Sequence, residues 1–134
     1  MPTFLLDNNH VGAALRKVSL VRDRIHQQRR LGHRFGTCVP VLCELEAGIV
    51  QTQDVADRRR RLRQLLTRVS IWPLEPQLAR SYGIVYHQLR QAGRSMSQVD
   101  MLLAALARQR SLTLLTSDRD FEALPDIHTE NWLV

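Results

Sequence analysis

Short runs of apolar residues alternate along the chain with longer segments in which apolar residues recur every three or four positions. Uninterrupted short runs are typical of buried strands, and the longer spacing is typical of amphipathic helices. We expect strands at residues 3–7, 35–39, 70–74, 112–116 and 127–134, the last at the edge of the sheet. We expect helices at residues 11–31, 39–49, 53–69, 77–91 and 97–109.

This regular alternation predicts an α/β fold. The central sheet should contain four or five mainly parallel strands, with helices on both faces, in a three-layer sandwich. A chain of 134 residues, of which 44% are hydrophobic, fits one domain over residues 1–134. In sheets of this kind, ligands bind at the carboxyl ends of the strands, near the point where the strand order reverses.

Four acidic residues stand at the joints between these elements, although the chain has only 13 acidic residues in all. Asp7 and Asp118 each follow a predicted strand, whereas Glu44 and Asp100 lie on predicted helices. Each has an ordinary explanation when taken alone. Asp7 and Asp118 can cap the segments that follow them, and Glu44 can be a solvated helix acid. Asp100 can complete a capping box with Ser97.

Taken together, the four acids indicate a shared cation site. Two carboxylates about 4 Å apart repel each other by about 4 kcal/mol at an effective dielectric constant of about 20, so a cation or a raised pKa must compensate. We place Glu44 at the flank of an apolar helix stripe, with Glu46 pointing more toward water. An all-oxygen ligand set of this kind favours Mg²⁺ or Mn²⁺.

The formal net charge of the chain is +6, and Lys17 is the only lysine. Because the planar guanidinium group matches phosphate and carboxylate, nucleic acid is the leading class of partner and an acidic protein is the second. No apolar stretch approaches the roughly 20 residues that span a membrane, and the first residues lack a basic leader. We therefore expect a cytoplasmic protein without membrane contact.

Arg58, Arg59, Arg60 and Arg61 form a run on one predicted helix. Consecutive helical positions fan out around the axis, so the four side chains cannot all face one ligand. Three interpretations stay open: a solvated helix surface, a track for RNA phosphates, or a docking surface for an acidic partner. We expect Cys38 and Cys43 to be buried thiols that pack as small hydrophobic groups.

The segments LLDNN, LCELEAG, SQVDMLLAALA and LLTSDRDFEALP occur in this order, followed by a tryptophan near the end of the chain. With them the chain resembles the PIN-domain ribonucleases over essentially its whole length, especially the small bacterial VapC-type toxins of toxin–antitoxin pairs. The resemblance implies that Asp7, Glu44, Asp100 and Asp118 are the catalytic, metal-binding acids. It also implies that Asn9 and Thr116 orient them.

Two positions depart from the pattern of this family. Asn8 replaces the usual threonine or serine after the first acid, and Cys43 replaces a small residue before the helix glutamate. The first change can alter hydrogen bonding around the metal site, and the second changes packing. Neither removes a carboxylate.

The resemblance implies an endoribonuclease in which Mg²⁺ or Mn²⁺ activates a water molecule, so that no protein nucleophile is needed. It also implies an RNA substrate, a homodimer and a cognate antitoxin protein. A rival interpretation keeps the fold but makes the chain a non-catalytic RNA- or protein-binding module. A phosphatase with Asp7 as nucleophile is a weaker rival, because Asn9 occupies the place of the second aspartate that such enzymes commonly carry.

Overall fold

The computed structural model describes residues 2–133 and arranges them around a five-stranded sheet in the order β3-β2-β1-β4-β5. Every strand pairing in it is parallel, which confirms the α/β class and the expected number of strands. The strands are β1 (Thr3–Leu6), β2 (Arg34–Thr37), β3 (Ser70–Ile71), β4 (Thr113–Leu115) and β5 (Thr129–Glu130).

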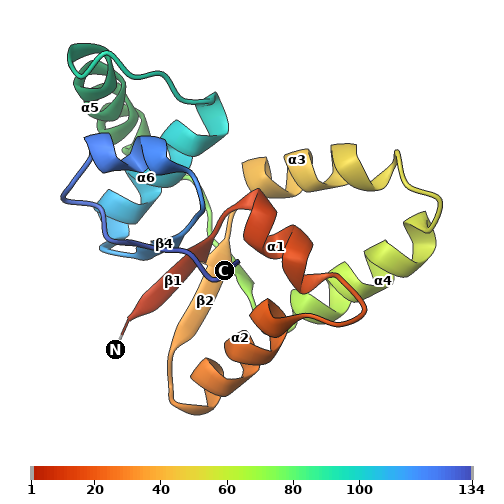
Figure 1. Ribbon diagram of the computed structural model, residues 1–134. Helices are drawn as coiled ribbons and strands as arrows, with labels where there is room; N and C mark the ends of the chain where they lie inside the picture. The colour runs from red at the N-terminus through yellow and green to blue at the C-terminus, as the bar shows by residue number, and fades with distance from the viewer. Residues whose placement is uncertain (1, 134) are drawn as a thin grey trace.

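Helices cover both faces of this sheet. Helices α5 and α6 pack together on one side of the strands, and the first four helices lie on the other side (Figure 1). The helices are α1 (Asn8–Ala14), α2 (Leu20–Arg30), α3 (Val39–Ile49), α4 (Val55–Leu65), α5 (Leu78–Gln91) and α6 (Gln98–Arg110), and a short 3-10 helix, η1 (Arg119–Ala123), follows β4. Among residues 2–133, no helix is both long enough and apolar enough to cross a membrane.

The strand order places β1 at the centre of the sheet, between β2 and β4. The chain runs outward from β1 through β2 to β3 and later returns to β4 on the other side of β1, so the strand order reverses between β1 and β4. Leu6 pairs with Leu115, and the backbone amide of Asp7 donates a hydrogen bond to the Leu115 carbonyl at 3.2 Å. The carboxyl ends of β1 and β4 therefore meet where ligands bind in open parallel sheets.

The central strands are apolar because helices cover them on both faces. Leu5 and Leu6 of β1 and Leu114 and Leu115 of β4 are fully buried, as are most apolar residues of α6. This packing holds the ends of β1 and β4 rigidly in register.

One expected element is wrong: residues 11–31 form two helices instead of one. Ser19 starts α2 as its N-cap, and its hydroxyl accepts a hydrogen bond from the Arg22 amide at 3.0 Å. The Arg22 guanidinium then donates to carbonyl oxygens of Ala14 and Lys17 at the end of α1. Val18, which fits the helical spacing, is 85% exposed in the turn between the two helices.

Several other elements are shorter than expected. The helix expected at residues 53–69 spans only Val55–Leu65, and the final strand ends at Glu130. The expected strand at 127–134 also includes Val134, which lies outside the described residues. Cys38 is buried as expected, but the expectation for Cys43 is wrong because it lies on the exposed side of α3.

Gly36 in β2 provides a test of how β3 is held against the sheet. A Cβ atom at this position would lie 2.5 Å from ring atoms of Trp72, which follows β3 and donates its amide to the Thr37 carbonyl. We expect Gly36→Ala to displace the indole ring and to lower the free energy of unfolding by about 1 to 3 kcal/mol.

Urea denaturation followed by circular dichroism measures this effect. Gly83→Ala in α5 is the control, because a Cβ atom there meets nothing within 4 Å. The control should be about 0.5 to 1 kcal/mol more stable than the parent, as expected for alanine in a helix interior. Equal stability of Gly36→Ala and the parent would contradict the assigned packing.

Candidate active site

Asp7 is positioned by its role as the N-cap of α1. Its Oδ1 accepts hydrogen bonds from the backbone amide of His10 and from His10 Nδ1, both at 2.8 Å. The residue is only 6% exposed. Among the described residues, Oδ2 of Asp7 accepts no hydrogen bond, so one carboxylate oxygen stays available to a ligand.

His10 holds Asp7 from within the core. Its side chain is fully buried, and its Nε2 accepts a hydrogen bond from the Trp132 backbone amide at 3.1 Å. Because Nε2 accepts, the imidazole is neutral and its proton lies on Nδ1, which donates to Asp7; this tautomer is assigned from the hydrogen-bond partners. No role for His10 was predicted from the sequence. A histidine three residues after an N-cap aspartate was the available signal.

Asp118 is positioned by the turn that follows β4. Its Oδ1 accepts a hydrogen bond from the Asp120 amide at 2.9 Å, and its own amide donates to Thr116 Oγ1 at 3.1 Å. Thr116 is buried, and its amide donates to the Glu130 carbonyl in β5. Thr116 thus fixes the backbone that carries Asp118, which agrees with the orienting role that the resemblance implies.

Asp100 lies in the first turn of α6, where its amide donates to Ser97 Oγ at 3.1 Å. Burial raises the pKa of its carboxyl group to about 6, and the negative charges of Asp118, Asp7 and Glu44 add to the rise. A hydrogen bond from Ser97 opposes it. The four acids predicted from the sequence therefore act on one another electrostatically, although they come from four different segments of the chain.

Glu44 is exposed on α3, so the expectation that Glu46 points more toward water than Glu44 is wrong. The half-buried acid is Glu46, whose Oε2 accepts from Arg59 Nη2 of α4 at 2.9 Å. The two glutamates flank the same apolar stripe, and Arg59 of α4 forms its ion pair on the side that carries Glu46. Glu44 instead lines an open groove together with Asn9, which is also exposed.

The acids do not form a finished ligand cage. Among residues 2–133, no three His, Cys, Asp or Glu side chains are arranged to hold one metal ion as they stand. Carboxylates repel one another when no cation lies between them, so repulsion opposes a closed arrangement of these acids. The donor set fits Mg²⁺ or Mn²⁺, because it consists of oxygen atoms. A further oxygen, Oδ1 of Asn8, is buried and has no hydrogen-bond partner among the described residues.

The arginine run makes several separate ion pairs. Each of its members bonds to an acid on α3, on α4 or at the start of α4. The partners are Asp54 for Arg58, Glu46 for Arg59, and Asp57 for both Arg60 and Arg61. The run therefore divides among three directions, with Arg58 at Asp54, Arg59 at Glu46, and Arg60 and Arg61 together at Asp57.

Acids that follow neighbouring parallel strands at a topological switch point are one arrangement by which hydrolases bind divalent metals. The chain belongs to the PIN domain family, whose pattern matches residues 6–127. The relatives described as ribonucleases include VapC4 of Mycobacterium tuberculosis, which is 27% identical over 82% of this chain and 86% of the relative. VapC5 of the same organism is 30% identical over 68% of this chain and 69% of the relative.

Solved structures share the fold. The VapBC2 complex of Rickettsia felis, bound to promoter DNA, includes a chain that matches with a TM-score of 0.86 and 23% identity, covering 97% of this chain and 98% of that chain. DNA-bound VapBC of Salmonella typhimurium matches with a TM-score of 0.83 and 24% identity, covering 98% and 99%. These matches confirm the PIN-like architecture.

The raised pKa of Asp100 has a consequence for stability. The folded-state pKa of about 6 lies above the ordinary value of 3.8, so the folded protein holds this proton more tightly than the unfolded chain. The loss of folding stability caused by ionised Asp100 is absent below about pH 4 and complete above about pH 6. Without divalent cations, we expect Asp100→Asn to raise the free energy of unfolding at about pH 8 by about 1 kcal/mol after allowance for solvent screening.

Thermal melts across pH, in the presence of a chelator, measure this difference, which should vanish toward about pH 4. Asp126→Asn is the control of opposite sign, because hydrogen bonds from Arg108 lower the pKa of Asp126. A gain in stability that is the same at all pH values would show that ionisation of the Asp100 carboxyl group is not its cause.

Proposed function

We propose that this protein is a divalent-metal-dependent endoribonuclease that hydrolyses phosphodiester bonds in RNA. The observation that carries the proposal is that Asp7 and Asp118, which follow the neighbouring strands β1 and β4, act with Glu44 on the charge of Asp100. Membership of the PIN domain family and the ribonuclease names of the relatives support the same reaction class.

Asp7, Asp100 and Asp118 are the main candidates for holding Mg²⁺ or Mn²⁺, and Glu44 is a further ligand or the group that positions water. A bound divalent cation supplies Lewis-acid activation of water and neutralises charge on the phosphate. The chain contributes orientation: His10 fixes one oxygen of Asp7, and Thr116 fixes the backbone of Asp118. Asn9 lines the same groove as Glu44, so a ligand in this groove can contact both side chains.

The proposal extends to a role as the toxin of a toxin–antitoxin pair. The solved structures with the same fold include VapBC complexes of Rickettsia felis and Salmonella typhimurium, and the VapC20 toxin of Mycobacterium tuberculosis is described as cleaving the sarcin-ricin loop. By analogy we propose a cytoplasmic protein that acts on RNA, assembles as a homodimer and is bound by a cognate antitoxin protein.

The non-catalytic alternative requires the acids to be neutralised within the chain. Asp7, Asp100 and Asp118 do take part in helix-end hydrogen bonds, as the ordinary explanations expected. Nevertheless, within residues 2–133 none of the four acids forms an ion pair with an arginine. Their negative charge is therefore available to bind a cation. This supports the proposed nuclease over the non-catalytic alternative.

Cleavage of purified cellular RNA in the presence of Mn²⁺ tests the proposed function. We expect Asp7→Asn and Asp118→Asn each to lower the rate by about 100-fold or more, because each removes a charge that holds the metal. A chelator should stop cleavage by the parent. Mapping the RNA ends at nucleotide resolution measures both rate and cleavage site.

Asp126→Asn is the matched control, since this exposed aspartate is paired with Arg108 far along α6 from Asp100. It should cleave like the parent. Circular dichroism establishes that each variant is folded. Folded Asp7 and Asp118 variants that cleave at the parental rate would refute the metal-dependent mechanism.

A further inference from the structure

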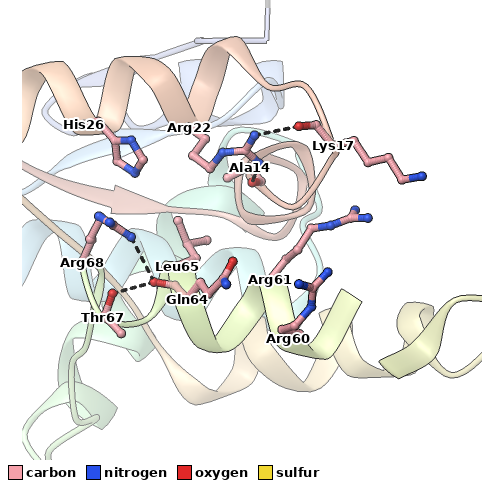
Figure 2. A pocket seen from close by; sticks show the side chains of 10 residues that line it. All are labelled: Ala14, Lys17, Arg22, His26, Arg60, Arg61, Gln64, Leu65, Thr67 and Arg68. Carbon is pink, nitrogen blue, oxygen red and sulfur yellow. Dashed lines mark hydrogen bonds between the residues drawn. The ribbon is translucent and has the colours of Figure 1, made fainter. Parts of the chain in front are cut away.

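A basic cavity of about 660 Å³ lies between α2 and α4, beside the turn that follows α1. Six of its ten lining residues are cationic or histidine, and none is acidic. Figure 2 shows Arg60 and Arg61 rising from α4, with His26 and Arg68 at the other end of the cavity. The six residues are Lys17, Arg22, His26, Arg60, Arg61 and Arg68.

Positive charge in this cavity is only partly compensated. Arg60 and Arg61 share Asp57, and Arg22 donates to backbone carbonyl oxygens. Within residues 2–133, Lys17 and Arg68 form no ion pair. Burial lowers the pKa of His26, and the charges of Arg68 and Arg22 lower it further, which is the response of an imidazole to a positive field.

A separate groove, lined by Glu44 of the four acids, carries further positive charge. The groove lined by Glu44 and Asn9 also contains Arg16 and Arg58. Arg16 is followed in the chain by Lys17 of the cavity. At the far end, His26 and Arg68 also line a second hollow, whose remaining lining residues are Arg29 and Arg30. We call this succession of groove, cavity and hollow the basic track.

The dimensions of the basic track suit a single nucleic-acid strand. Helix α1 has seven residues and carries Asn9 near its start and Ala14, which lines the cavity, at its end. Seven helical residues extend about 10 Å, which is roughly three stacked nucleotides at about 3.4 Å each. A strand with its scissile phosphate at the acids therefore reaches the cavity within a few nucleotides.

We infer that the basic track binds backbone phosphates of the RNA strand beyond the scissile bond. This inference rests on the proposed ribonuclease function and extends it to the substrate: RNA long enough to fill both the acid site and the cavity. Carboxylates of an acidic protein would also suit guanidinium groups. Continuity with the acid site favours RNA, because the track starts at the groove that contains Glu44.

The test compares a variant that combines Lys17→Gln and Arg68→Gln with the parent. Binding of fluorescent oligouridylates of about 4 and about 16 nucleotides is measured by anisotropy in a chelator, where cleavage is absent. We expect the double variant to bind the longer oligomer about tenfold more weakly at low salt and to lower the salt slope by about 1.4, since two phosphate contacts are lost. The gain in affinity from the short to the long oligomer should shrink.

Arg63→Gln is the matched control, because Arg63 is an exposed arginine of α4 that does not line the cavity. It should bind both oligomers like the parent. Parental affinity of the double variant for the longer oligomer would overturn the inference. Tighter binding of a polyglutamate peptide of equal length, lost in the double variant while oligouridylate binding is unchanged, would also overturn it and assign the cavity to an acidic protein.

Failure of this inference can be distinguished from failure of the proposed nuclease function. Binding is read without metal and without cleavage, whereas the nuclease proposal depends on Mn²⁺-dependent cleavage and its loss in the acid variants. Unaltered melting temperatures of the double variant establish that the lost affinity is not caused by unfolding. The substituted side chains are both exposed, so their loss leaves the core intact.

Discussion

The repulsion between carboxylates held at the centre of the sheet is the constraint on which the site depends. The backbone fixes each of these groups for its own reasons: Asp7 and Asp118 follow neighbouring parallel strands, and Asp100 lies in the first turn of α6. Packing of the fully buried Leu6 and Leu115 prevents the strand ends from separating to relieve the repulsion. Burial is the main cause of the raised pKa of Asp100, and the negative charges of Asp118, Asp7 and Glu44 raise it further.

The same site depends on the other end of the chain. The neutral imidazole of His10 joins Asp7 to the backbone of Trp132, which is 122 residues further along the sequence. Trp132 is held in turn by ring contacts with Phe4 and Phe35 and by the Arg24 guanidinium 4.0 Å from its ring centroid. The aromatic cluster therefore supports the orientation of the Asp7 carboxylate as well as the stability of the sheet.

Local patterns predicted the fold and the acids, because apolar runs, strand-end aspartates and helix caps are short-range features. The break between α1 and α2 was missed, since Val18 continues the helical spacing while the Ser19 cap and the Arg22 contacts end it. The sequence of α3 alone could not predict that Glu46 is more buried than Glu44, because the ion pair that holds Glu46 comes from Arg59 on α4. The contact of His10 with Asp7 and Trp132 could not be predicted for the same reason, because Trp132 lies at the far end of the chain.

The basic track and the four acids would act in opposite ways on a bound nucleic acid. The chain carries a net charge of +6, yet its arginine run is paired with acids of α3 and α4, and the four site acids are paired with no arginine in residues 2–133. A polyanion attracted along the basic track meets repulsion at the acids until a cation neutralises them. Because such coupling is reciprocal, a metal that strengthens RNA binding must itself be bound more tightly when RNA is present. Under the proposed function, metal and RNA would therefore each strengthen the binding of the other.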